Sequence, residues 1–511
     1  MMTKTAYAGA LAGALAAALA AGPALAGPAP IVLAVEGGAI EGTYADGVRS
    51  FKGVPFAAPP VGALRWKAPQ PVRPWPGVRP AKDFGPRAMQ LPLFADMVFR
   101  SPGIEEDCLY LNVWTPLAPA SKKLPVLVYF HGGGLAAGDG SEPRYDGAAM
   151  ARQGIVALTV NYRLGVFGFL AHPELSAEGA VRASGNYGLM DQAAALRWVQ
   201  RNIAAFGGDP AQVTIAGESA GSYSVSAQMV NAQARGLFAR AIGESGSVLG
   251  LEAPPTLAEA EQQGVAFASA AGAASLAALR ALPAAQLLEV AGRPGMPWFS
   301  IVTDGAVIER PPLETYRRGL QARVPLLAGW NSQEMGADAL LGQAPATKEA
   351  FAAALERLYG DRAADAARAY DYDVPDAARD LASDRWIVYG TWKWIDLHRR
   401  VAPTYRYYFT RPRPGAAGGA VHSGEIEYAL GNLDGNKVYR WNDDDRRVSA
   451  TMQTYFANFI RTGNPNGAGL AHWPSVDHPA PNVMRIDVAS DVYNPRDRAR
   501  FEFHDRQNTA P

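Results

Sequence analysis

A serine between two glycines could serve this chain as a nucleophile. The segment Gly217–Gly221 reads Gly-Glu-Ser-Ala-Gly and follows the apolar run Val213–Ala216, and the pattern after it predicts a helix over Tyr223–Ala232. A strand, a sharp turn and a helix in this order form the elbow that presents a nucleophilic serine. Glycine two positions to either side lets the strand and the helix approach without a Cβ clash. An ordinary Gly/Ser turn is the alternative, so Ser219 must be judged by its partners.

The first partner required is a base that accepts the serine proton. The chain has 7 histidines, and only His422 follows a strand-like run through one short Gly/Ala loop in its last third. That is where an elbow fold carries its base. The alternative for His422 is a surface-loop histidine. The other six lie in a glycine loop, a His-Pro pair, a helical pattern, a Trp-Pro region or near the C-terminus: His131, His172, His398, His472, His478 and His504.

The second partner is an acid that orients the base. Glu334 follows the strand-like run Val324–Gly329 and lies between Ser219 and His422 in the chain. Asp304, in Thr-Asp-Gly, and Asp338 are rivals, although Asp304 is more typical of a turn. We therefore expect the order Ser219, Glu334, His422.

The third requirement is a set of N–H groups for the oxyanion. Gly133 and Gly134 follow the strand-like run Val126–Phe130, and Ala220 follows the serine. Glycines allow the backbone N–H groups to approach a developing negative charge, and we expect these three residues to form the oxyanion hole. The glycine loop also mimics a dinucleotide fingerprint, but Asn161-Tyr162-Arg163 stands where that motif expects an acid.

Three further groups are interpreted as structural. Ser245 lies in Gly-Glu-Ser-Gly-Ser, a degenerate copy of the elbow, and is expected to support the site rather than react. Asp443–Asp445 lacks the regular spacing of metal ligands and is predicted to be a solvated loop. Cys108 is the only cysteine and lies in an apolar, strand-like run, which predicts a buried, inert thiol.

The elements that must position these residues alternate between strands and helices. Buried strands are predicted over 124–130, 155–162 and 213–216, and further strands over 324–329 and 405–410, whereas 188–206 has helical spacing. This alternation predicts an α/β fold with a large, mostly parallel sheet covered by helices on both faces. Helical insertions are predicted at about 251–297 and 346–398, as caps or side regions.

The composition and the N-terminus constrain location and partners. Lys4, the Ala-rich stretch 8–21 and Ala24-Leu25-Ala26 predict a signal peptide over residues 1–26, followed by one domain over 27–511. The expected location is therefore secreted or periplasmic. Lys+Arg and Asp+Glu both number 48, so we expect no nucleic-acid partner. No later stretch is apolar enough for a membrane anchor, and the oligomeric state is not predicted.

Several motifs together resemble the type-B carboxylesterases, relatives of the cholinesterases. The similar segments extend over nearly the whole predicted mature chain: 51–57, 106–114, 161–165, 185–192, 206–210, 217–222 and 463–466. The resemblance implies an α/β-hydrolase fold and hydrolysis of carboxylic esters through an acyl-enzyme, with no cofactor or metal. It implies the same triad, Ser219, Glu334 and His422, and the same oxyanion donors.

The chain departs from the family pattern at two places. Members often pair the cysteine at position 108 with one upstream, and here the segment 85–90 has none. Cholinesterases carry a choline-binding tryptophan in this region, but the chain has none between Trp75 and Trp114. The expected function is thus a serine carboxylester hydrolase. The alternatives are a non-catalytic binding protein of this fold, or a lipase or specialised natural-product esterase.

Overall fold

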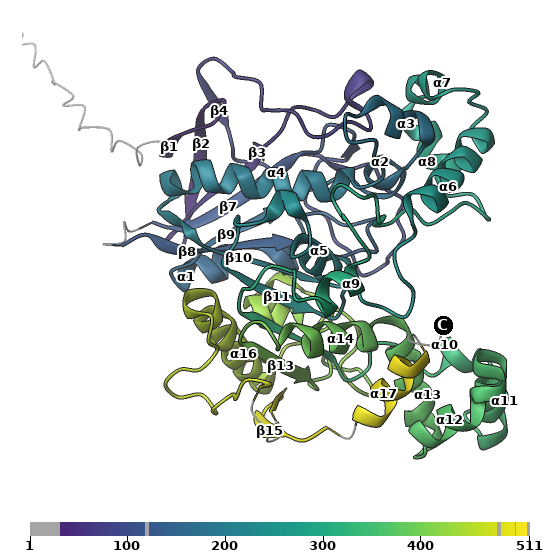
Figure 1. The fold of residues 1–511 in the computed structure, drawn as a ribbon. Helices are drawn as coiled ribbons and strands as arrows, with labels where there is room; N and C mark the ends of the chain where they lie inside the picture. The colour runs from purple at the N-terminus through teal and green to yellow at the C-terminus, as the bar shows by residue number, and fades with distance from the viewer. Residues whose placement is uncertain (1–30, 118–121, 478–481, 496, 508–511) are drawn as a thin grey trace, which may run out of the picture.

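The computed structural model describes residues 31–117, 122–477, 482–495 and 497–507, and its dominant feature is one large twisted sheet (Figure 1). The sheet has 13 strands, in the order β1-β2-β3-β7-β9-β8-β10-β11-β12-β13-β14-β15, with β4 beside β2. Neighbouring strands from β9 through β14 run parallel, whereas β7 is antiparallel to β9 and β15 to β14. The predicted large, mostly parallel sheet is confirmed.

The strands have the following bounds: β1 Ile31–Val35, β2 Gly38–Ala45, β3 Val48–Pro55, β4 Val78–Pro80, β5 Arg87–Ala88, β6 Ile104–Glu105, β7 Tyr110–Pro116, β8 Leu124–Phe130, β9 Val156–Val160, β10 Gly208–Glu218, β11 Arg240–Glu244, β12 Leu326–Asn331, β13 Thr404–Phe409, β14 Val483–Ile486 and β15 Asp491–Tyr493. All five strands predicted from the sequence are present. Their ends shift by a few residues, most in β10, which begins at Gly208.

The helices have the following bounds: α1 Ala148–Arg152, α2 Gly165–Phe169, α3 Pro173–Glu178, α4 Tyr187–Asn202, α5 Ala220–Gln228, α6 Leu257–Ala270, α7 Leu276–Ala281, α8 Ala284–Ala291, α9 Pro312–Arg317, α10 Asp338–Leu341, α11 Lys348–Tyr359, α12 Ala363–Ala369, α13 Val374–Ser383, α14 Tyr389–His398, α15 Ile426–Leu430, α16 Asp443–Thr462 and α17 Arg498–Gln507. The helix predicted over 223–232 begins earlier, at Ala220, directly after the elbow serine.

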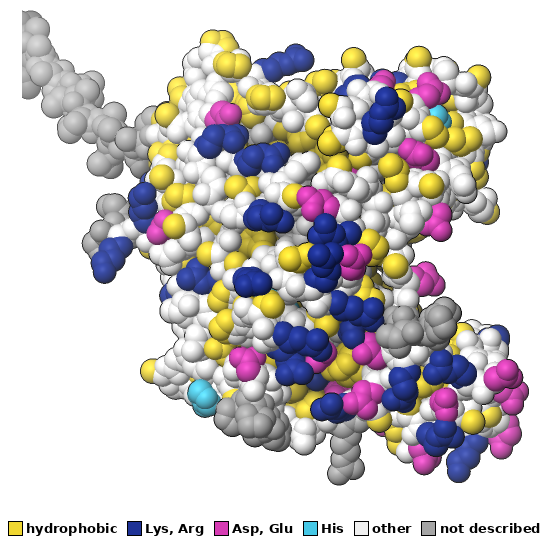
Figure 2. Space-filling model, viewed as in Figure 1, with side chains coloured by type: hydrophobic (Ala, Val, Ile, Leu, Met, Phe, Trp, Pro, Cys, Tyr) yellow, Lys and Arg dark blue, Asp and Glu magenta, His cyan; other side chains and the backbone are white. Residues whose placement is uncertain are grey.

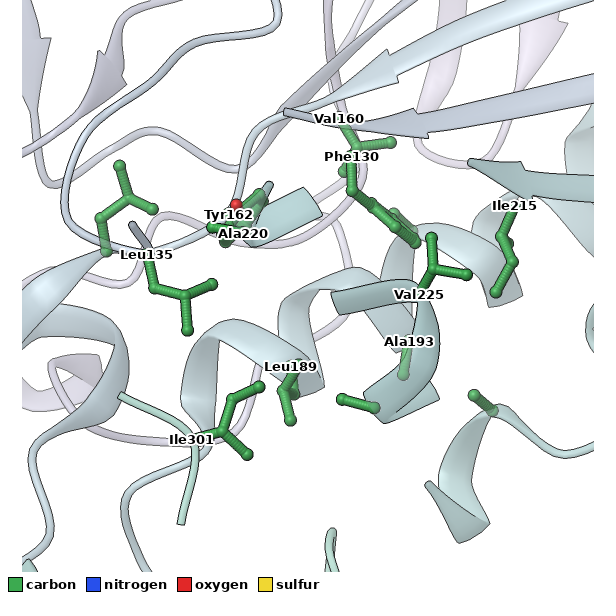
Figure 3. Close-up of a cluster of buried hydrophobic side chains, with 14 of the residues drawn as sticks. Phe130, Leu135, Val160, Tyr162, Leu189, Ala193, Ile215, Ala220, Val225 and Ile301 are labelled. Carbon is green, nitrogen blue, oxygen red and sulfur yellow. The ribbon is translucent and has the colours of Figure 1, made fainter. Parts of the chain in front are cut away.

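Alternating side chains of the central strands build two cores, one on each face of the sheet. In β8, Val126, Val128 and Phe130 pack with α4 and α5. Leu127 and Tyr129 point to the opposite face and pack with α16. Side chains that alternate between the two faces with a period of two, and are apolar on both, are typical of a strand that is buried on both faces. Figure 3 shows part of the first core, with Phe130, Ile215 and Val225 among its labelled side chains.

Helices occupy both regions predicted as insertions. The range 251–297 contains α6, α7 and α8, and the range 346–398 contains α11 to α14. Helices α10 to α13 have a small core of their own that also takes in Phe503 of α17, whereas α14 packs in the first core. The predicted signal peptide, residues 1–26, lies outside the described residues.

One local prediction is wrong. Asp443–Asp445 is not a loop but the first turn of α16. Asn442 and Asp445 form a capping box, in which each side chain accepts the other residue's backbone N–H. Acidic side chains are stabilised at this end of a helix by the helix dipole, which explains the run of three aspartates without a metal.

The surface carries no block of one charge on the face in view. Figure 2 shows Lys/Arg and Asp/Glu side chains interspersed over the sheet and the helical regions, with the outline indented between α6–α8 and α10–α13. Within the described ranges, no helix is long and apolar enough to cross a membrane.

Candidate active site

Ser219 stands at the strained turn that the sequence predicts. It has φ 56° and ψ −122°, a backbone region that non-glycine residues rarely occupy, between the end of β10 and the start of α5. Its N–H donates to the Glu244 carbonyl at 2.8 Å. A Cβ at Gly221 would overlap the carbonyl oxygen of Phe130, and one at Gly217 would overlap the backbone of Gly221. The two glycines therefore allow β8, β10 and α5 to meet at the serine.

Glu334 and His422 are brought together although 88 residues separate them. Nδ1 of His422 lies 2.7 Å from Oε2 of Glu334, so a protonated Nδ1 donates to the carboxylate. The other oxygen, Oε1, accepts from the Ser245 hydroxyl and the Asn331 N–H, both at 2.6 Å. Glu334 is buried, whereas the His422 side chain keeps 22% of its exposure. The acid is thus held at both oxygens, and the imidazole faces the active-site space.

The remaining imidazole nitrogen, Nε2, faces the elbow. It lies 3.2 Å from Oε1 of Glu218, the residue before the serine. Among the described residues, the Ser219 hydroxyl has no hydrogen bond to His422. Hydrogen bonds between nucleophile and base are often long without substrate, so this arrangement is compatible with proton transfer. Glu218 was missed by the sequence analysis as a neighbour of the base.

The predicted oxyanion donors lie around the same point. Gly133 and Gly134 have φ of 105° and 64°, in the region that favours glycine. Their N–H groups donate no hydrogen bond to another described residue. Ala220 is the first residue of α5, where a helix leaves its N–H without an intrahelical acceptor. A Cβ built at Gly132, the residue before Gly133, would lie 3.3 Å from Cβ of Ser219. The glycine loop is therefore in contact with the serine.

Buried glutamates set the electrostatics of His422. Burial alone would lower the pKa of His422, but the carboxylates of Glu218, Glu334 and Glu425 outweigh it and raise this pKa to about 9. Burial raises the pKa of Glu218 to about 8 and that of Glu425 to about 7. Oε2 of Glu425 accepts from Nδ2 of Asn331, the residue whose N–H also holds Glu334.

The rival histidines lie elsewhere or have other partners. His131 is buried and stacks on Tyr162 at 4.5 Å, and His172 caps α3. His398 bonds to the Val324 carbonyl and His504 to the Tyr370 hydroxyl. His472 is an exposed residue between α16 and β14, and His478 lies outside the described residues.

The other rival groups are structural. Asp304 accepts three backbone N–H groups in a turn, and Asp338 starts α10. Cys108 is buried just before β7, and burial raises its pKa well above the usual value. Within the described ranges, no group of His, Cys, Asp and Glu side chains could hold a metal.

Comparisons with known proteins agree with this geometry. The sequence pattern of the Carboxylesterase family matches residues 29–504. The chain belongs to this family. Fumonisin B1 esterase from Sphingopyxis macrogoltabida is 35% identical over 474 residues, which cover 87% of this chain and 84% of the relative. Para-nitrobenzyl esterase from Bacillus subtilis is 33% identical over 480 residues, covering 91% and 96%.

The solved structures lead to the same conclusion. A structure of a PNB esterase superposes with a TM-score of 0.80 at 32% identity, covering 94% of this carboxylesterase and 99% of that chain. The fold is therefore the α/β-hydrolase fold, and the enzyme hydrolyses carboxylic esters by the serine chemistry of its family.

Aromatic side chains border the site of this carboxylesterase. The Trp386 ring lies against the His422 ring at 4.5 Å between centroids and is 42% exposed. Trp298 is 58% exposed, and its indole N–H donates to the Gly134 carbonyl at 3.0 Å. Phe299, the residue after Trp298, is buried in the core, as is Met89.

Proposed function

We propose that Ser219, His422 and Glu334 are the catalytic triad of this esterase. The hydrogen bond of 2.7 Å between His422 Nδ1 and Glu334 Oε2, beside a serine at a strained elbow, is the observation that carries the proposal. Glu334 fixes the tautomer in which Nε2 is free to accept a proton, and it stabilises the imidazolium that forms. The alternative of a non-catalytic binding protein does not account for an acid held at both oxygens against this histidine.

The proposed reaction proceeds in two halves. His422 takes the proton of Ser219 as its oxygen attacks the ester carbonyl, and the N–H groups of Gly133, Gly134 and Ala220 hold the resulting oxyanion. His422 then protonates the departing alcohol oxygen and leaves an acyl-serine. Water, deprotonated by His422, attacks the acyl-serine, and His422 returns the proton to the Ser219 oxygen as the bond to the acyl group breaks and the acid leaves. No cofactor or metal takes part in any of these steps.

The experiment compares ester turnover and covalent labelling in single variants. For Ser219→Ala and His422→Ala we expect kcat to fall by about 10³-fold or more, because triad members act as a unit. A fluorophosphonate probe labels the wild type at Ser219 and leaves Ser219→Ala unlabelled. Ser247→Ala is the matched control, because this buried serine donates to the Gly390 carbonyl. Activity of Ser219→Ala within tenfold of the wild type, about 1.4 kcal/mol in the barrier, contradicts the assignment.

We further propose that the enzyme is exported, to the periplasm or the medium. The proposal rests on the charged, Ala-rich and small-residue segments of residues 1–26. Mass spectrometry of the exported protein is expected to give Gly27 as its first residue. Retention of the full N-terminus in the cytoplasm would contradict it. The equal numbers of acidic and basic residues support a small-molecule ester rather than a nucleic acid as partner.

A further inference from the structure

A cavity of about 530 Å³ next to the proposed active site has charged side chains of both signs in its lining. We call it the Arg144 pocket. Its charged lining residues are Asp96, Glu142, Arg144, Arg413, Glu427 and Lys437. The ester chemistry proposed above uses none of them, so their presence beside the site requires another explanation.

Two sides of the Arg144 pocket touch the catalytic apparatus. Nη2 of Arg413 donates to the carbonyl of Ser423, the residue after His422, at 2.9 Å. On the other side, the loop that carries Asp96 packs on the oxyanion glycines. A Cβ at Gly133 would lie 2.8 Å from Cε of Met97, the residue after Asp96. A group bound in the pocket would therefore lie beside an ester held at Ser219.

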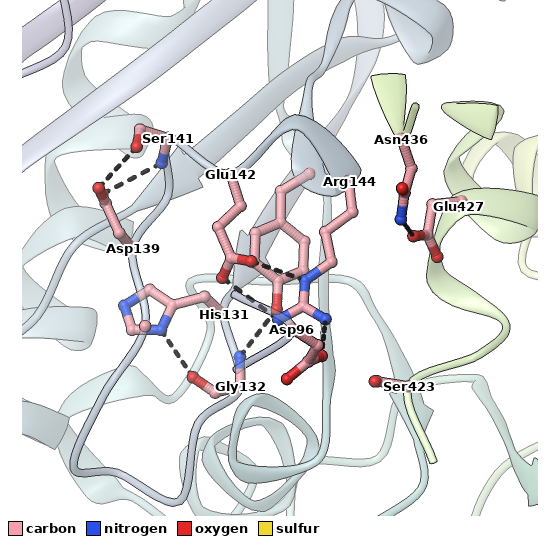
Figure 4. A network of polar contacts seen from close by, with 12 residues as sticks. Asp96, His131, Gly132, Asp139, Ser141, Glu142, Arg144, Ser423, Glu427 and Asn436 are labelled. Carbon is pink, nitrogen blue, oxygen red and sulfur yellow. Dashed lines mark hydrogen bonds and ion pairs between the residues drawn. The ribbon is translucent and has the colours of Figure 1, made fainter. Parts of the chain in front are cut away.

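The two acids that balance the arginines most firmly are buried. Arg144 Nε lies 2.9 Å from Glu142, whose side chain is 1% exposed. Arg413 Nη2 lies 3.0 Å from Glu427, also 1% exposed. Because both carboxylates are enclosed with their partners, they belong to the wall of the pocket. Figure 4 shows this wall, with Arg144 between Glu142 and Asp96.

The third acid of the pocket, Asp96, is held differently. Its carboxylate lies 3.0 Å from Nη1 of Arg144, but its side chain is 50% exposed. Half of the Asp96 side chain faces water, so another carboxylate can reach the pair and take over the contact with the buried Arg144, which keeps an anionic partner throughout. The edge of the Arg144 guanidinium has a geometry that matches a carboxylate.

Two more cationic side chains line the pocket. Nε of Arg413 is buried and has no hydrogen-bond partner among the described residues. Lys437 lines the pocket and forms no ion pair within the described ranges. When a carboxylate of the substrate replaces Asp96, the charge beside Arg144 is unchanged, and Lys437 lines the pocket as a further cation.

We propose that the Arg144 pocket binds a free carboxylate carried by the ester substrate, and that Asp96 occupies Arg144 until the substrate displaces it. This inference rests on the proposed active site and adds a class of substrate, esters that bear a carboxylate near the scissile bond. The carboxylate could belong to the acyl or to the alcohol part, and both are tested.

The experiment uses matched pairs of esters that differ only in a terminal carboxylate. Monoethyl adipate is compared with ethyl hexanoate for the acyl part, and an acetate ester of a terminal hydroxyhexanoate with hexyl acetate for the alcohol part. The readout is the ratio of kcat/KM for the acidic and the neutral ester in the same preparation. In the wild type we expect a ratio well above one for at least one pair, which also assigns the carboxylate to acyl or alcohol.

Variants of the pocket separate binding from catalysis. In the double variant Glu142→Gln/Arg144→Met we expect the ratio to fall about tenfold or more, the usual effect of losing a charge-assisted hydrogen bond. Lys437→Ala lowers the ratio less, and Asp96→Asn raises it because the competing carboxylate is gone. Lys348→Ala, at the exposed start of α11, is the control and leaves the ratio unchanged. Thermal melting establishes that each variant is folded.

A ratio near one for both pairs, or a ratio that Asp96→Asn and Lys437→Ala leave unchanged, overturns the inference. Asp96 and Lys437 are exposed, so these two variants keep the test decisive if the double variant fails to fold. Hydrolysis of the neutral esters reports separately on the triad. If the wild type cleaves neutral esters but the ratio stays near one, the pocket proposal fails while the proposed active site stands.

Discussion

Several carboxyl groups lie close to His422. Glu334 holds Nδ1 at 2.7 Å, and Glu218 lies 3.2 Å from Nε2, so one carboxyl flanks each nitrogen. Negative charge near an imidazole favours its protonated form, which is the form that must be stabilised after proton transfer. The free enzyme therefore holds the imidazole proton to a higher pH. This is a cost, because the imidazole can act as a base only when it is neutral.

Glu218→Gln is expected to change the pH dependence of kcat/KM. The change removes a carboxylate whose charge raises the pKa of His422, so this pKa falls from about 9 and neutral imidazole forms at lower pH. We expect the acidic limb of the kcat/KM profile to move to lower pH by about one unit. Glu218 and His422 titrate as a pair, and the profile reports the pair.

The control for this prediction is Glu425→Gln. Glu425 has a smaller effect on the pKa of His422 and is bound to Asn331 instead, so the acidic limb moves less. A profile that stays in place for Glu218→Gln, or moves to higher pH, would show that Glu218 does not set the charge of the base.

At the scale of elements, the site depends on how closely β8, β10 and α5 approach one another. Gly221→Ala tests this, because the added Cβ would overlap the Phe130 carbonyl in β8 and push α5 away. We expect a loss of about 1–3 kcal/mol in the free energy of unfolding and a fall in kcat, since Ser219 moves with α5. Denaturant unfolding and ester turnover measure the two effects.

Gly103→Ala is the matched control for the glycine test. Nothing lies within 4 Å of a Cβ built at Gly103, and its φ is not positive. We expect stability and turnover close to those of the wild type. Equal behaviour of the two variants would mean that the close approach at Gly221 does not position the serine.

The elements also explain which parts of the site could be predicted from the sequence. Ser219, Glu334 and His422 each follow a strand, and the ends of neighbouring parallel strands meet at one edge of a sheet. Local pattern was therefore enough to propose these three residues together, and the structure places Glu334 in contact with His422. Glu218 and Asn331 bear on the site only through side-chain directions that the fold decides, so no spacing revealed their contacts. Asp443–Asp445 was misread because acidic residues suit both loops and helix starts.

At the scale of the whole molecule, α17 joins the helical region α10–α14 to the sheet. Phe501 is fully buried, and its ring packs on Trp330 of β12 at 5.8 Å and on Trp392 of α14 at 5.0 Å between centroids. Two residues later, Phe503 packs on Tyr359 of α11 at 5.0 Å. The last described helix thus contacts both the strand that leads to Glu334 and the small core of the helical region.

Phe501→Ala is expected to weaken this junction. Removing a fully buried phenylalanine costs about 3–5 kcal/mol, because the apolar contacts are lost and a cavity remains. We expect a clear drop in Tm, together with faster amide hydrogen exchange in α10–α13, since α17 no longer clamps that region against β12. Glu502→Ala is the control, because its carboxylate is 46% exposed and pairs only with the exposed Arg498. A drop in Tm as small as that of Glu502→Ala would mean that the helical region is held by its own core, and that α17 does not contribute to its stability.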